Sequence, residues 1–278
     1  MPLKLAISGK GGVGKTTIAA VLSRLHGQEG RKVLAVDADP SPSLMAAVGI
    51  PKKERDRAKP LATMQDLIEE RTGAKPGQGY GGMFKLNPQV ADLMESYSVE
   101  GPDKVEVLVL GTISKAGNGC FCPESTLLKR VMDHLLLEED EIVIIDMEAG
   151  LEHLGRATAR SVDLMLIVVE PGQRSMETAA NIDRMSRELG IKHVAVVLNK
   201  ISSPEEDATV RRELDAYHLD VIAALPFEKA LVDADLSGSS VFDAPGVEKY
   251  VAATRVLKAV VDERARSMGF APAASSKK

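Results

Sequence analysis

Eight residues near the start of the chain have the types and spacing of a phosphate-binding loop. Residues 9–16 read Gly-Lys-Gly-Gly-Val-Gly-Lys-Thr, which fits the pattern G-x-x-x-x-G-K-[ST]. The glycines let the backbone turn its N–H groups onto a polyphosphate, and the N-terminus of the following helix adds its dipole. We expect Lys15 to bind the β- and γ-phosphates and Thr16 to bind Mg²⁺. The predicted nucleotide-binding set is Gly11, Gly12, Val13, Gly14, Lys15, Thr16 and Thr17.

Carboxylates follow two of the predicted strands. Asp37 and Asp39 end the run that begins near residue 32, and Asp146 ends the apolar run 142–145. Ligands bind at the carboxyl ends of parallel strands in doubly wound sheets. Three such carboxylates around one phosphate-binding loop therefore indicate a Mg²⁺ site, with Asp146 as the Walker B residue behind the ion. The spacing from Asp146 to Gly150 is that of a switch II segment, whose glycine N–H can sense a γ-phosphate.

A third strand end suggests which base is bound. Asn199 and Lys200 are similar to the start of the N-K-x-D element that recognises guanine, but position 202 is serine. Because the carboxylate that would bind guanine is missing, adenine is favoured. We expect Asn199, Pro226 and Phe227 to form the adenine pocket.

The two cysteines form a second site of chemical interest. Cys120 and Cys122 are separated by one residue, so in an extended segment both sulfurs face the same side. Pro123 suits the first position of a helix, which places Cys122 at a helix N-terminus, where the dipole favours the thiolate. Two thiolates are too few for a tetrahedral soft-metal site, but a two-fold dimer would supply four. The alternative is a pair of inert buried thiols.

Alternating strands and helices must position these residues. Seven nearly continuous apolar runs predict strands covered on both faces, at 3–8, 32–37, 106–111, 141–146, 163–169, 193–199 and 220–225. Amphipathic stretches predict helices at 16–28, 123–137, 177–189 and 204–217. This order predicts one α/β domain over residues 1–268, with a doubly wound, mostly parallel, seven-stranded sheet.

Three segments depart from this alternation. Residues 51–103 show no strand pattern, and they contain a possible helix at 61–71 and a glycine-rich loop at 77–82. We interpret them as an insertion, either a functional lid or partner surface or an excursion that caps one sheet edge. Residues 269–278 are small and polar, which predicts a disordered tail. A terminal helix at 247–268 should pack on the sheet through Tyr250, Val251, Val256, Leu257, Val260 and Val261.

Composition excludes several classes of protein. The chain has 278 residues, 44% of them hydrophobic and 27% charged, which excludes disorder for its bulk. Its 35 basic and 40 acidic residues give a net charge of −5, so no nucleic-acid partner is expected. The sequence shows no signal peptide and no run approaching 18 apolar residues. We therefore expect a cytoplasmic protein without a membrane partner.

A second lysine early in the loop gives the first family resemblance. Lys10 marks the deviant form of the phosphate-binding loop, and the chain resembles the MinD/ParA-type (SIMIBI) family of dimeric P-loop ATPases. In that family the early lysine crosses the dimer interface to the partner's nucleotide, so the resemblance implies a homodimer in which Lys10 acts on the other chain. It also implies that Asp37 binds Mg²⁺ through water and that Asp39 orients the attacking water.

A closer resemblance rests on four segments: the deviant loop, residues 84–88, residues 120–124 and residues 146–156. Over residues 4 to about 265 the chain is similar to the CooC-type nickel-insertion ATPases, which mature carbon monoxide dehydrogenase, and to their acetyl-CoA synthase relatives. The similarity implies a nucleotide- and metal-dependent homodimer. It would bind Ni²⁺ or Zn²⁺ through both cysteine pairs and couple ATP hydrolysis to nickel insertion. His153 would be a transient metal ligand, a contact to the acceptor enzyme or a structural residue.

Two other functions compete with this one. An iron–sulfur carrier resembling the nitrogenase iron protein would draw one of its two cysteines from switch II, and residues 146–150 contain none. A positioning ATPase of the MinD/ParA class would need a membrane-seeking helix or a basic DNA-binding face, and neither is evident. A metal carrier explains two cysteines one residue apart better than either alternative does.

Overall fold

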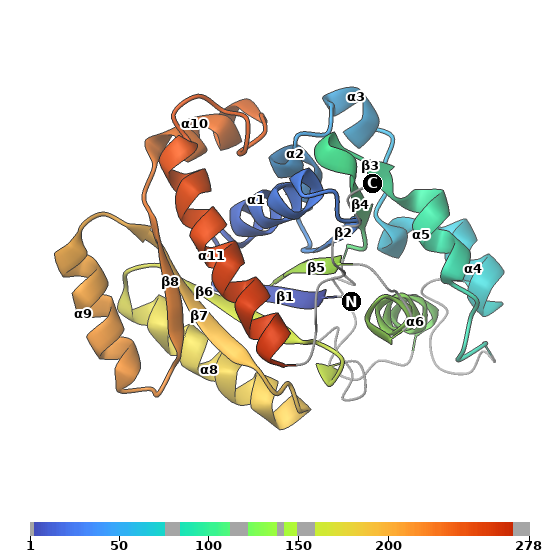
Figure 1. Cartoon of the computed structure of the whole chain (residues 1–278). Coiled ribbons are helices and arrows are strands. Elements are labelled where there is room, and N and C mark those ends of the chain that lie inside the picture. Colours follow the sequence, from blue (N-terminus) through green and yellow to red (C-terminus); the bar gives the residue numbers. More distant parts are fainter. Residues whose placement is uncertain (1–2, 76–83, 112–121, 138–141, 149–158, 269–278) are drawn as a thin grey trace.

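A computed structural model describes residues 3–75, 84–111, 122–137, 142–148 and 159–268 of the chain. These residues form an eight-stranded sheet in the order β3-β4-β2-β5-β1-β6-β7-β8 (Figure 1). All strand pairs are parallel except β3 with β4, which is antiparallel. The predicted doubly wound, mostly parallel α/β fold is confirmed.

The seven predicted strands are present within one or two residues of their expected ends. They are β1 (Leu3–Gly9), β2 (Val33–Ala38), β4 (Val105–Val109), β5 (Ile142–Met147), β6 (Leu164–Val169), β7 (Val194–Ile201) and β8 (Val221–Pro226). The predicted strand number was wrong by one, because β3 (Val99–Glu100) adds an edge strand. A strand of two residues leaves no periodic pattern in a sequence, so residues 99–100 fall within the predicted insertion.

Helices cover both faces of the sheet, as Figure 1 shows. One face packs against α1 (Lys15–Gln28), α2 (Leu44–Val48), α10 (Lys229–Ser237) and α11 (Glu248–Ser267). The other packs against α4 (Gln65–Thr72), α5 (Ala91–Tyr97), α6 (Pro123–Leu137), α8 (Gln173–Leu189) and α9 (Pro204–Asp215). Each central strand therefore contributes to two cores: Val143 and Ile145 of β5 lie in one, while Ile142 and Ile144 lie in the other. This arrangement explains why the strand sequences are continuously apolar.

The described part of the insertion packs into the fold. It contains α3 (Lys52–Arg55), the 3₁₀ helices η1 (Leu61–Thr63) and η2 (Pro102–Lys104), and also α4, α5 and β3. The helix expected at 61–71 is present as η1 followed by α4, and Leu61, Ile68 and Leu93 are buried. Through β3 this segment caps the β4 edge of the sheet. The glycine-rich loop at 77–82 and the tail at 269–278 lie outside the described residues.

The terminal helix α11 packs on the sheet as expected. Tyr250, Leu257 and Val261 are buried, whereas Val256, which was predicted to share their face, is 65% exposed. Among the helices that the structure describes, none has the length and apolar character needed to span a membrane.

Candidate nucleotide-binding site

The site lies where the parallel strands end. The phosphate-binding loop connects β1 to α1, and β1 lies between β5 and β6. Asp37 and Asp146 lie near the ends of β2 and β5, Glu170 directly follows β6, and Asn199 and Lys200 lie in β7. Because these strands are parallel, their carboxyl ends meet at one edge of the sheet. The fold therefore gathers at one edge the polar residues that the sequence disperses over nearly 200 positions.

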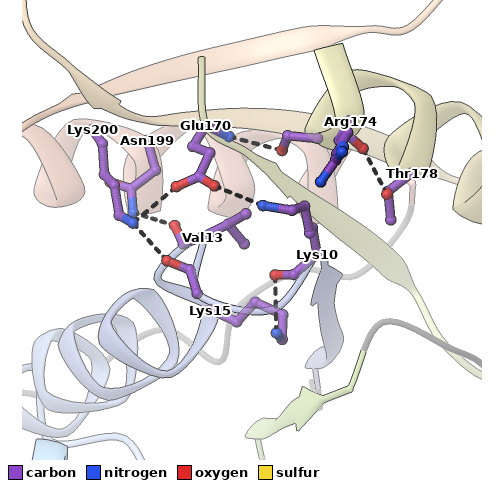
Figure 2. A network of polar contacts seen from close by, with 10 residues as sticks. Lys10, Val13, Lys15, Glu170, Arg174, Thr178, Asn199 and Lys200 are labelled. Carbon is purple, nitrogen blue, oxygen red and sulfur yellow. Dashed lines mark hydrogen bonds and ion pairs between the residues drawn. The ribbon is translucent and has the colours of Figure 1, made fainter. Parts of the chain in front are cut away.

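Two glycines of the loop occupy positions that no other residue fits. Gly9 has φ 151°, and an added Cβ would lie 2.5 Å from the carbonyl oxygen of Val168. Gly14 has φ 95°, and an added Cβ would lie 2.3 Å from Nδ2 of Asn199. Positive φ values favour glycine because it has no Cβ. Lys15 is 7% exposed and directs Nζ toward its own loop, 3.4 Å from the carbonyl oxygen of Lys10 (Figure 2).

A buried carboxylate pair marks the expected Mg²⁺ site. Asp37 and Asp146 are register partners in β2 and β5, and each is 1% exposed. Thr16 donates its hydroxyl hydrogen bond to Oδ2 of Asp146 at 2.5 Å. Asp37 accepts backbone N–H bonds from Ser43 and Leu44, each at 2.9 Å, and from Asp39 at 3.2 Å.

The second carboxylate oxygen of Asp146, Oδ1, is available to bind a cation. Oδ1 of Asp146 is buried and has no hydrogen-bond partner among the described residues. Burial, and then the charge of Asp37, raise the pKa of Asp146 to about 7. A buried carboxylate oxygen without a partner needs an explanation, and Mg²⁺ prefers oxygen ligands of this kind. The residues Thr16, Asp37 and Asp146 therefore fit a Mg²⁺ ion.

A cavity of about 610 Å³ opens beside the loop. Small-molecule sites have volumes of roughly 300–1,000 Å³. Predicted residues that line it are Gly11, Gly12, Gly14, Lys15, Thr16, Thr17, Asp39, Asn199, Pro226 and Phe227. Asp39 is half-buried and accepts the backbone N–H of Ser41 at 2.9 Å. Val13 differs from the others because its side chain is buried in the core, and its carbonyl oxygen contacts Asn199. The structure thus brings the predicted phosphate-binding and base-binding residues around one cavity.

Asn199 is engaged within the chain. Its Nδ2 donates to the carbonyl oxygen of Val13 at 2.7 Å, and its Oδ1 accepts from the hydroxyl of Tyr250 at 3.2 Å. The side-chain amide of Asn199 therefore links the phosphate-binding loop to α11 by two hydrogen bonds. Recognition of adenine by Asn199 stays a prediction.

Two residues of the site carry roles that the sequence reasoning missed. Oε1 of Glu170 lies 3.2 Å from Nζ of Lys10, and Oε2 lies 2.9 Å from Nζ of Lys200 (Figure 2). Burial alone would raise the pKa of Glu170, but hydrogen bonds from Lys200 and Lys10 outweigh it and hold that pKa below its usual value. The signal for Glu170 was available, because it ends an apolar strand just as Asp146 does. The sequence pattern predicts Lys200 only as part of a base-recognition element.

The cysteine segment is described only in part. Cys122 is half-buried and directly precedes α6, which begins at Pro123 as predicted. Its Sγ accepts the backbone N–H of Ser125 at 3.4 Å, and its carbonyl oxygen accepts that of Thr126 at 3.0 Å. Cys122 therefore caps the helix. Cys120, Gly150 and His153 lie outside the described residues.

One other group of described side chains has the donor types of a metal site. Potential ligand atoms of His26, Glu29 and Asp262 all lie within 4.8 Å of one another. However, Nζ of Lys258 donates to Glu29 at 2.6 Å and to Asp262 at 2.7 Å. Because Lys258 already pairs with both acids and Arg31 lies 3.9 Å from Asp262, we interpret this group as an ion-pair network that joins the end of α1 to α11.

Comparisons with known proteins agree with this geometry. Residues 4–241 match the model of the CobQ/CobB/MinD/ParA nucleotide binding domain. The carbon monoxide dehydrogenase accessory protein CooC of Rhodospirillum rubrum is 42% identical over 87% of this chain and 90% of that protein. An uncharacterized ATP-binding protein of Methanocaldococcus jannaschii is 43% identical over 86% of this chain and 91% of that protein.

Solved structures show the same fold. The septum site-determining protein MinD of Pyrococcus horikoshii, complexed with Mg-ADP, superposes with a TM-score of 0.67 at 22% identity, covering 95% of this chain and 98% of that one. A ParA family ATPase of Chlorobium tepidum gives a TM-score of 0.66 at 17% identity, covering 93% and 98% of the two chains. The chain belongs to the CobQ/CobB/MinD/ParA nucleotide-binding family and is a P-loop ATPase related to CooC.

Proposed function

We propose that this ATPase is a metallochaperone that carries Ni²⁺ between two subunits and delivers it to carbon monoxide dehydrogenase or acetyl-CoA synthase. The observation that carries the proposal is the closely spaced pair Cys120 and Cys122, with Cys122 capping α6, in a chain 42% identical to a carbon monoxide dehydrogenase accessory protein. Zn²⁺ is the alternative cargo, since thiolate sites bind both metals.

The nucleotide half of the proposal uses the described cavity. Residues 1–268 act as one ATPase domain, with Lys15 contacting the β- and γ-phosphates. Thr16, Asp37 and Asp146 hold Mg²⁺, which when bound neutralises charge on the phosphates. Asp39, which lines the cavity, orients the attacking water, and Asn199, Pro226 and Phe227 surround adenine. Lys10 of each chain reaches the nucleotide of the other, so hydrolysis requires two chains face to face.

The metal half of the proposal follows from symmetry. A two-fold dimer has the same surface patch on both subunits, so two Cys120–Cys122 pairs supply the four thiolates of a tetrahedral site. ATP closes the dimer and sets the spacing of these sulfurs. Hydrolysis relaxes the dimer, changes the thiolate geometry and releases the metal to the acceptor enzyme.

The test is an anaerobic titration of metal-free protein with Ni²⁺, followed by thiolate-to-metal absorption and by sedimentation. We expect one tightly bound Ni²⁺ per two chains. Cys120→Ser and Cys122→Ser should lose the metal while monomer ATP binding persists. The matched variant Ser125→Ala should keep the metal, because the hydrogen bond that Ser125 donates to the sulfur comes from its backbone N–H. No binding, or one Ni²⁺ per monomer, contradicts the proposal. A stable brown chromophore near 400 nm after iron–sulfur reconstitution would favour the iron–sulfur carrier instead.

A further inference from the structure

Lys10 has an ion-pair partner inside its own chain. Its Nζ lies 3.2 Å from Oε1 of Glu170, and the two side chains are 39% and 22% exposed. The two residues lie side by side because β1 and β6 are neighbouring parallel strands, with Gly9 the register partner of Val168. Figure 2 shows Lys10 reaching from the loop across to the strand end that carries Glu170.

The carboxylate of Glu170 also binds a second lysine. Nζ of Lys200 lies 2.9 Å from Oε2 of Glu170 and donates to the carbonyl oxygen of Gly12 at 2.6 Å. The backbone of Lys200 has φ 61°, a left-handed conformation that non-glycine residues keep only where their surroundings hold it. Glu170 therefore bridges Lys200 of β7, which a second hydrogen bond holds against Gly12, and Lys10 of the loop, and both lysine side chains are 39% exposed.

This arrangement lets Lys10 leave at low cost. A partly buried carboxylate that loses its only cation is left unpaired, which is unfavourable. Glu170 would keep Lys200 after Lys10 departs, so its charge stays compensated. Lys10, for its part, would exchange one carboxylate for the more highly charged phosphates of a nucleotide on a second chain.

We propose that Glu170 is a positioning residue that holds Lys10 within its own subunit and releases it when a second copy of this chain presents a nucleoside triphosphate. The inference rests on the proposed function, in which Lys10 acts across a dimer. The Glu170–Lys10 ion pair must then break before two chains associate, so it opposes dimer formation. A triphosphate, with its additional charge, competes with Glu170 more strongly than a diphosphate does. Since a ligand shifts an equilibrium only by its differential affinity for the two states, this competition favours the dimer with ATP over ADP.

The test measures the dimer dissociation constant by sedimentation with a non-hydrolysable ATP analogue. Glu170→Gln keeps the shape of the side chain but removes its charge, so Lys10 is freed in both subunits before association. A partly exposed ion pair changes an equilibrium constant by a factor of about 1.5 to 5. Two such pairs break per dimer, so we expect the dimer Kd to fall roughly two- to twenty-fivefold. Glu177→Gln, on the exposed side of α8, is the matched control and should leave Kd unchanged.

A double variant separates release of Lys10 from a general charge effect. In a Lys10→Ala background, Glu170→Gln should no longer change Kd, because the lysine on which it acts is gone. An unchanged or weaker dimer for Glu170→Gln in the wild-type background overturns the inference, and so does an equal tightening in the Lys10→Ala background. If the wild-type chain shows no association with the analogue at any protein concentration, the proposed dimer itself fails, which is distinct from failure of Glu170 alone.

Discussion

At the scale of single residues, one asparagine links the phosphate-binding loop to the other end of the chain. Asn199 is 3% exposed, binds the loop through Val13 and accepts the hydroxyl of Tyr250, which is fully buried. Burial raises the pKa of Tyr250, so its hydroxyl stays protonated and remains a donor. Gly14 leaves the space that the amide of Asn199 occupies. The conformation of the loop thus depends on α11.

We predict that Tyr250→Phe destabilises the phosphate-binding loop without creating a cavity in the core, because phenylalanine keeps the ring. The substitution removes one hydroxyl and leaves Oδ1 of Asn199 without its donor, which should lower the free energy of unfolding by about 1–2 kcal/mol. It should also weaken ATP binding by a few-fold, measured by calorimetry alongside urea unfolding. Tyr217→Phe, at a 39% exposed tyrosine, is the control and should change neither quantity. Equal behaviour of the two variants would contradict this role of Tyr250.

Motif residues could be predicted from the sequence, and their partners could not. Thr16 and Asp146 could be predicted because a loop pattern and an acid after an apolar run are local signals. The structure places Oγ1 of Thr16 2.5 Å from Oδ2 of Asp146. The hydroxyl of Tyr250 was missed because the residue fits an apolar helix face. The contact of Glu170 with Lys10 joins residues 160 positions apart, and no local pattern reports a contact at that separation.

At the scale of elements, the long helices and strands could be predicted because their burial leaves an apolar pattern in the sequence. Strands buried on both faces are continuously apolar, and helices that pack on a sheet are amphipathic, while a capping residue marks the start of a helix in some cases. α9 begins at Pro204, and Oγ of Ser203 accepts the backbone N–H of Glu206. The elements that were not predicted include β3, with two residues, and α2, with five. Such short elements depend on tertiary packing rather than on their own sequence.

The contact between α1 and α11 includes an unusual histidine. His26 on α1 is fully buried, and neither ring nitrogen has a hydrogen-bond partner among the residues described. Burial, and then the charge of Lys258 on α11, lower the pKa of His26 to about 3. In the unfolded chain a histidine has a pKa of about 6.5. Between these two values the unfolded state binds the proton and the folded state does not, so stability falls as the pH falls below 6.5.

We predict that His26→Leu makes stability less dependent on pH. Between pH 7 and pH 5 the wild-type free energy of unfolding should fall by about 2 kcal/mol more than that of the variant. Urea unfolding at the two pH values measures the difference. His218→Asn, at an exposed histidine, should behave like the wild type. A wild-type protein and a His26→Leu variant with the same pH dependence would show that His26 takes up its proton in the folded state.

At the scale of the whole molecule, the proposed mechanism requires two chains. One chain provides the cavity, the buried carboxylates and a lysine held by Glu170. The resemblance to dimeric ATPases predicted that Lys10 acts on a second chain, and composition or periodicity alone could not have done so. Which surfaces meet depends on the shape of two folded chains, and a single sequence does not encode that in any local pattern.

The most direct measurement of the central claim, that each catalytic site is assembled from two chains, is ATP hydrolysis by mixed variants. Lys10→Ala and Asp39→Ala should each bind ATP and be inactive alone. Mixed in equal amounts before ATP is added, they should form heterodimers with one complete site, built from Asp39 of one chain and Lys10 of the other. Half of the dimers are then mixed and have one active site of two, so about one quarter of wild-type activity should return. An inactive mixture, or normal hydrolysis by Lys10→Ala alone, would contradict the account.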